Sequence, residues 1–285
     1  MQPRLNNSGA EAVHQSAPMG WPWRSWRAYR DLERTWFYAC AGLFLLMVFC
    51  LLAGAIDDRL FNGVSVWSKP FKFALSLAVY FATLLAFSYY LPNGYLRTTA
   101  GRVLVVSLTW VAGIEMVYIT IQSALGEASH FNTTTAFHRL MYSLMGLGAA
   151  WLVTALVWFA WVIGRNNVQR NPIALAIVVG LVLTFILGGG FGGYLGGQTS
   201  HWVNAVQSDA NGVVFFNWAT EGGDLRVAHF FGIHAMQAVP LFALLLPAQM
   251  TYMAKCILIA AFSSAYAGLC AFTFYQALQG QPFIG

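Results

Sequence analysis

Two histidines and a glutamine stand in the otherwise apolar stretch RVAHFFGIHAMQAVP at residues 226–240. His229 and His234 could ligate a metal or a haem, because neutral imidazole is the commonest metal ligand in proteins. Five residues of helix turn the side chains roughly 140° apart and separate them by ~7.5 Å along the axis. Each histidine is therefore expected to meet its partner on another helix, with Gln237 orienting His234.

A carboxylate and two further histidines belong to the same predicted site. Glu115 and His234 each lie ~13 Å below the same end of their helices, so the two side chains are expected to share one cavity. An unpaired acidic residue inside a membrane costs ~2.5–3.5 kcal/mol, which favours such a pair. His138 is the expected partner of the histidines in 226–240, and His130 is an additional ligand candidate. The predicted site residues are Glu115 as the catalytic group, His138, His229, His234 and Gln237 for cofactor binding, and His138, His229 and His234 with His130 as metal ligands.

The chain that must position these residues is too apolar for a soluble protein. Of its 285 residues, 58% are hydrophobic and 9% are charged, against about 25% charged in soluble domains. A membrane span needs roughly 20 apolar residues, and lipid requires a helix because a helix satisfies its own backbone groups. The sequence therefore predicts an all-α polytopic membrane protein, a bundle of about seven transmembrane helices. The expected spans are Trp36–Ala55, Phe71–Leu91, Val103–Ala124, Met141–Ile163, Pro172–Leu195, Val227–Leu246 and Ala254–Ala277.

The distribution of positive charge predicts the orientation of the bundle. Ten of the 15 Lys and Arg residues lie in the N-terminal tail and in every second loop. Positive residues favour the cytoplasmic side, so the N-terminus is expected inside and the C-terminus outside. We expect a cytoplasmic tail with an interfacial amphipathic segment at 1–34, the bundle at 35–279 and a periplasmic tail at 280–285. The long outer loop 198–223 is expected to act as a lid or to lie on the membrane surface.

Three strings resemble segments of a family of uncharacterised bacterial multipass inner-membrane proteins. They are WSKPFKFALS at 67–76, ASHFN at 128–132 and HFFGIHAMQ at 229–237. The resemblance covers residues 65–245 and implies a location in the bacterial inner (cytoplasmic) membrane. It implies no activity.

The residues favour a cofactor-binding redox function. A b-type haem takes one histidine from each of two helices, and His138 with His229 or His234 would supply them. A transition metal is the other cofactor that these side chains suit. Glu115 would then transfer a proton or interact with a quinone.

Three other functions stay open, and the sequence leaves undecided whether the protein is an enzyme. The first is a transporter of small molecules or ions, with a polar path formed by Lys72, Glu115, His234 and Gln237. The second is a zinc-dependent membrane hydrolase, with ligands from His130, His138, His201 and His229. The third is a structural subunit of a larger membrane complex or oligomer. The net charge of +5 suits anionic lipid, so the bilayer is the expected partner and nucleic acid is not.

Overall fold

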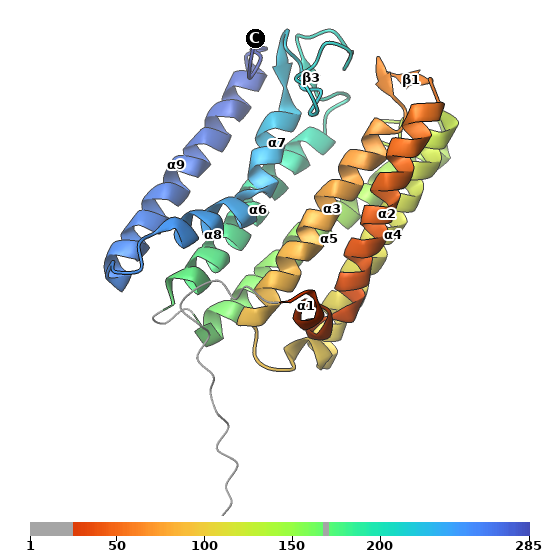
Figure 1. The fold of residues 1–285 in the computed structure, drawn as a ribbon. Coiled ribbons are helices and arrows are strands. Elements are labelled where there is room, and N and C mark those ends of the chain that lie inside the picture. The colour runs from red at the N-terminus through yellow and green to blue at the C-terminus, as the bar shows by residue number, and fades with distance from the viewer. Residues whose placement is uncertain (1–24, 168–170) are drawn as a thin grey trace, which may run out of the picture.

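A computed structural model describes residues 25–167 and 171–285 of the chain. Long helices dominate it and lie side by side (Figure 1). The long helices are α2 (Arg34–Ile56), α3 (Ser68–Phe87), α4 (Thr99–Leu125), α5 (Ala136–Asn167), α6 (Pro172–Gly196) and α9 (Tyr252–Leu278). The shorter helices are α1 (Trp26–Leu32), α7 (Leu225–Ile233) and α8 (Ala235–Leu245), with 3₁₀ turns at Ser88–Tyr90 and Tyr95–Arg97. The strands are β1 (Leu60–Phe61), β2 (Val64–Ser65), β3 (Trp202–Val203) and β4 (Gly223–Asp224).

The predicted all-α membrane fold is confirmed. Six described helices are long and apolar enough to cross a membrane, and the bent pair of α7 and α8 gives a seventh when it is counted as one span. Helix α1 and the C-terminus lie at opposite ends of the bundle (Figure 1), as an odd number of crossings requires. Which end faces the cytoplasm stays a prediction.

The helices pack around one apolar core. Helix α2 packs along α3, α5 packs along α6, and α6 contacts both α7 and α8. Trp36 is fully buried and lies 6.3 Å from the ring of Phe81 and 6.2 Å from the ring of Phe159. The close approach of α6 and α7 depends on glycine, because a Cβ on Gly188 would stand 3.0 Å from the backbone nitrogen of Ile233.

The sixth span is not the single helix expected over Val227–Leu246. Helices α7 and α8 meet at His234 with a bend of 52°. An unbroken helix would bond the Met236 N–H to the carbonyl four residues earlier, but this N–H donates to Thr184 Oγ1 of α6 at 2.8 Å. The hydroxyl of Tyr266 on α9 donates to the carbonyl of Phe231 at 2.7 Å. Neighbouring helices thus satisfy the backbone groups that the break sets free, which makes the break compatible with lipid.

The loop 198–223 folds over one end of the bundle. Strand β3 in this loop pairs antiparallel with β4, which leads into α7. The backbone N–H of Asp209 donates to the carbonyl of Asn62 at 2.8 Å, in the turn between β1 and β2. The loop and the β1–β2 hairpin therefore cover the same end, which Figure 1 shows at the top. Whether the loop opens as a lid stays a prediction.

Candidate functional site

Charged side chains from three parts of the chain gather beneath the loop 198–223. We call this group the loop-end cluster, and its members are Lys69, Lys72, Asp209, Asp224 and Arg226. The first two begin α3, Asp209 lies in the loop, and the last two lie where β4 joins α7. Lys69 is within electrostatic reach of Arg226, Asp209 and Lys72.

Arg226 is the best-paired cation of the cluster. Its guanidinium donates to Asp209 Oδ1 at 2.8 Å and to Asp224 Oδ2 at 2.7 Å. It also donates to the carbonyl of Asn217 at 2.6 Å. Asp224 is almost fully buried and caps α7 by accepting from the Arg226 N–H. Both carboxylates of the cluster are therefore engaged by one arginine.

The positive charges of the two lysines of the cluster are less well neutralised. The ammonium of Lys72 donates to the carbonyl of Phe216 at 3.2 Å and to the side-chain oxygen of Asn217, which are neutral groups. Lys69 lies 6.0 Å from the ring centre of Phe73. In residues 25–167 and 171–285 no hydrogen bond or ion pair involves the Lys69 ammonium. With three cations and two carboxylates, the cluster carries one excess positive charge.

Two histidines border the cluster in neutral form. The ring of His130 lies 5.2 Å from that of Phe73, and its Nδ1 is 3.1 Å from Ser129 Oγ. Burial, together with the charge of Lys69, lowers the pKa of His130 well below its usual value of 6.5. Burial also lowers the pKa of His201. His201 Nε2 lies 3.9 Å from Asp209 Oδ1, which is too far for a hydrogen bond, and is buried without a partner.

His229 lies within α7, and His234 lies at the break between α7 and α8. His229 Nδ1 lies 3.1 Å from the carbonyl oxygen of Gly188, and His234 Nδ1 lies 3.2 Å from Gln237 Oε1. The amide of Gln237 donates in turn to Thr83 Oγ1 of α3 at 3.0 Å. Because both Nδ1 atoms face acceptors, both carry the proton, and each Nε2 presents a lone pair. The expected contact of Gln237 with His234 is present.

Glu115 lies apart from the break. It is 8% exposed, and its Oε1 is buried without a hydrogen-bond partner. It faces Gly148 of α5, where a Cβ would stand 2.5 Å from Oε1. Helix α4 packs against α3 and α5, and no hydrogen bond joins Glu115 to His234 in the described residues. The expected direct pair is therefore absent, because matched depth does not fix the order of helices around the bundle.

His138 lies at the end of the bundle, in the first turn of α5. Its Nε2 is 3.3 Å from Glu127 Oε2 and its Nδ1 is 2.9 Å from Thr135 Oγ1. These residues line a pocket of about 590 Å³ together with Phe131 and Asn132. His138 is expected to meet the histidines of 226–240. In the structure it contacts Glu127 instead.

No three His, Cys, Asp or Glu side chains form a group that could hold a metal ion in the described part of the chain. The described residues therefore do not bring His138, His229, His234 and His130 together, and the expected metal site stays a prediction. His138 and His130 lie at the loop end, whereas His229 packs on the glycines of α6 and His234 marks the break. These residues therefore lie at different depths of the bundle and on different elements.

Sequence reasoning placed too little weight on Lys69 and on His201. Two features of the sequence could have indicated them. One is the start of a span with two lysines, SKPFK, and the other is a long loop that contains acidic residues but no Lys or Arg. No protein-family model, curated protein or solved structure matches the chain. The functional argument therefore depends on the residues themselves, and the resemblance to a bacterial inner-membrane family stays a prediction.

Proposed function

We propose that the protein is a membrane transporter that moves a small anion together with a proton. The observation that carries this proposal is the break of the sixth span at His234. Discontinuous helices near the middle of the bilayer commonly form the substrate and ion sites of transporters. His234 follows nine residues of helix from Leu225, so it lies roughly 13 Å from the loop end, near the middle of a ~30 Å hydrocarbon layer.

The break favours an anion electrostatically. The N-terminus of α8 begins at Ala235, directly after the break. A helix N-terminus stabilises an anion by about 0.3–1 kcal/mol when exposed and by up to ~2 kcal/mol when partly buried. This is less than the cost of placing a charge in lipid, so an anion held here needs a compensating positive charge nearby.

His234 can supply that charge by taking up a proton. Its Nδ1–H is committed to Gln237, so the lone pair of Nε2 is the position where a proton binds. Protonation would convert the ring to an imidazolium and offset the charge of an anion beside it. Proton uptake and anion binding at the break would then favour each other.

The loop-end cluster supports an anionic substrate independently. Its excess positive charge lies beneath a folded loop, where low-dielectric walls strengthen the attraction of an anion. Lys69 offers an ammonium without a carboxylate partner in the described chain. An anion arriving from the loop side would be bound here first.

A stripe of polar side chains on α3 connects the cluster to the break. Lys72, Ser76, Tyr80 and Thr83 follow at helical intervals and share one face. Lys72 contacts the loop, and Thr83 accepts from Gln237. We propose that the anion moves along this stripe from the loop end to the break.

The haem or metal function is less well supported by this geometry. Both ring nitrogens of His138 have close partners, Glu127 and Thr135. The Nε2 atoms of His229 and His234 remain suitable as ligands, but they belong to helix faces that do not converge in a three-ligand group of the described residues. A redox role stays a prediction that an absorption spectrum and metal analysis of the purified protein would test.

Anion binding can be tested before the natural substrate is known. Purified protein in detergent would be melted with formate, acetate, succinate, choline and glucose, each in excess. We expect at least one of the three anions to raise the melting temperature, because a ligand at 100 times its Kd stabilises by about 2.7 kcal/mol. Lys69→Met should abolish this rise, and the matched control Lys255→Met, at the other end of the bundle, should retain it.

Two results would contradict the proposal. One is stabilisation by choline or glucose with none by any anion. The other is an anion effect of the same size in wild type and Lys69→Met. The melting temperature of each variant without ligand shows that it is folded.

A further inference from the structure

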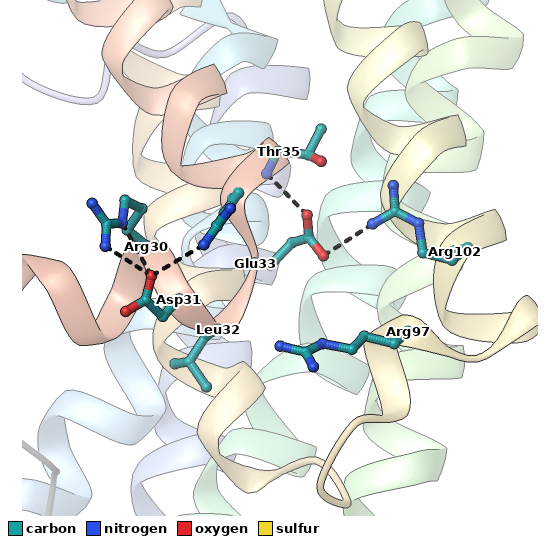
Figure 2. A pocket seen from close by; sticks show the side chains of 8 residues that line it. Arg30, Asp31, Leu32, Glu33, Thr35, Arg97 and Arg102 are labelled. Carbon is teal, nitrogen blue, oxygen red and sulfur yellow. Dashed lines mark hydrogen bonds and ion pairs between the residues drawn. The ribbon is translucent and has the colours of Figure 1, made fainter.

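A second charged site lies at the opposite end of the bundle from the loop-end cluster. A pocket of about 680 Å³ opens there between the start of α2 and the segment that leads into α4 (Figure 2). We call it the arginine pocket. Its lining residues are Arg30, Asp31, Leu32, Glu33, Arg34, Thr35, Arg97 and Arg102.

The acidic side chains of the arginine pocket compensate only part of its positive charge. Asp31 lies 3.0 Å from the guanidinium of Arg30 and 4.0 Å from that of Arg34. Glu33 lies 3.2 Å from the guanidinium of Arg102 and also accepts from the backbone N–H of Thr35. Four guanidiniums and two carboxylates leave two excess positive charges.

Arg97 carries charge that nothing else in the pocket balances. Figure 2 shows its side chain extending from the turn before α4 toward Leu32 and Glu33, with no interaction drawn to it. Within the described residues, no hydrogen bond or ion pair involves its guanidinium. The pocket thus presents an unpaired guanidinium on the same side as a partly neutralised arginine, Arg102.

The arginine pocket lies at the level of lipid headgroups. It is formed where the apolar spans α2 and α4 begin, at Arg34 and Thr99. Helix α1 beside it has the marks of an interfacial segment, because Trp26 is 58% exposed and Arg27 lies 5.3 Å from its ring centre. Exposed tryptophan and arginine side chains concentrate at the membrane–water interface.

We infer that the arginine pocket binds a phosphate group, supplied by an anionic phospholipid headgroup or by free phosphate. Guanidinium groups bind phosphate oxygens through paired, charge-assisted hydrogen bonds. Basic pockets between spans at the interface recognise lipid headgroups in this way. Arg97 and Arg102 would hold the phosphate from one side and Arg34 from the other, linking α2 to α4. This inference does not depend on the transport function.

Native mass spectrometry of the purified protein tests the inference with defined lipids. The protein would be equilibrated with equal amounts of phosphatidylglycerol and phosphatidylcholine, and the bound fraction of each measured. We expect one phosphatidylglycerol to be retained preferentially. Arg97→Gln should reduce its affinity roughly tenfold, because one charged partner of the phosphate is removed. Arg165→Gln is the matched control, since Arg165 lies over Trp161 near the same end of the bundle but outside the pocket.

A second arm separates the two sources of phosphate. Inorganic phosphate would be titrated into lipid-depleted protein while the melting temperature is followed in wild type and Arg97→Gln. A rise that Arg97→Gln loses, without selective retention of phosphatidylglycerol, would support free phosphate as the ligand. Equal retention of both lipids combined with no effect of phosphate, or unchanged binding in Arg97→Gln, would overturn the inference.

Discussion

At the scale of single residues, Lys69 and His201 bear on the anion site that we propose, because neither the Lys69 ammonium nor His201 Nε2 has a hydrogen-bond partner in the described chain. A buried polar atom left without a hydrogen bond costs about 1–3 kcal/mol. His201 Nε2 is such an atom, and the Lys69 ammonium forms no hydrogen bond or ion pair in the described residues. Proteins retain such costly groups mainly where they serve a function. We therefore expect both residues to matter more for ligand binding than for folding.

The burial of His201 predicts how the free energy of unfolding depends on pH. Burial lowers its pKa below 6.5, although Asp209 and Asp224 oppose this shift while Arg226 adds to it. The folded protein then binds fewer protons than the unfolded chain below pH 6.5, so the free energy of unfolding falls as the pH falls. One such histidine contributes up to about 1.4 kcal/mol per pH unit. His130 shifts in the same direction and adds to the slope.

The melting temperature measured from pH 8 to pH 5 tests this dependence. We expect a plateau above about pH 6.5 and a decline below it. His201→Gln should show a shallower decline than the wild type. A flat profile in the wild type, or the same decline in His201→Gln, would show that the His201 ring is solvated.

Residue spacing along one helix predicted contacts better than residue depth did. His234 and Gln237 stand one turn apart on the sequence, and their side chains meet in the structure. Glu115 and His234 stand at one depth, yet they lie on helices that do not pack together extensively. Local spacing is fixed by helix geometry, whereas contacts between helices depend on a packing order that hydropathy does not encode.

At the scale of elements, the break in the sixth span could not be predicted from its own sequence. The polar residues of that span suggested a function but not a bend. The bend depends on Thr184 and Tyr266, which lie on other helices and accept from or donate to the freed backbone groups. The presence of the unbroken spans was predictable from length and apolar composition. Their ends were less so, because α5 begins at Ala136 and not at the expected Met141.

Thr184→Val tests whether the break is needed for function. Valine has the shape of threonine but no acceptor, so the Met236 N–H would be left unsatisfied at a cost of about 1–3 kcal/mol. We expect a lower melting temperature and loss of the stabilisation by anions. Thr184→Ser keeps the hydroxyl and should preserve both. Wild-type behaviour of Thr184→Val in both measurements would mean that the hydroxyl does not maintain the break.

At the scale of the whole molecule, the odd number of crossings places the two described ends on opposite sides of the membrane. The distribution of Lys and Arg predicts that the loop-end cluster faces outward. Alkaline phosphatase fused after Gly285 should then be active, because this enzyme works only outside the cytoplasm. A fluorescent reporter that folds only in the cytoplasm should stay dark at the same position. The reverse pair of results would invert the topology and direct the loop-end cluster to the cytoplasm.

Two charged sites at opposite ends of one bundle suit a transporter that is anchored on one leaflet and binds its substrate on the other. The excess charge of the loop-end cluster, the break at His234 and the polar stripe of α3 each support movement of an anion. The arginine pocket would hold α2 and α4 against the headgroups while the α7–α8 pair changes its conformation. In the transport function that we propose, an anion and a proton cross the membrane together.

Uptake into proteoliposomes tests this claim most directly. Vesicles with reconstituted protein would receive a radiolabelled anion that stabilises the protein in detergent, with and without a proton gradient directed into the vesicle. The account predicts uptake that the gradient accelerates, that Lys69→Met and Thr184→Val abolish, and that Thr184→Ser and Lys255→Met preserve. Uptake no faster than in protein-free vesicles, or uptake that ignores the proton gradient, would contradict it.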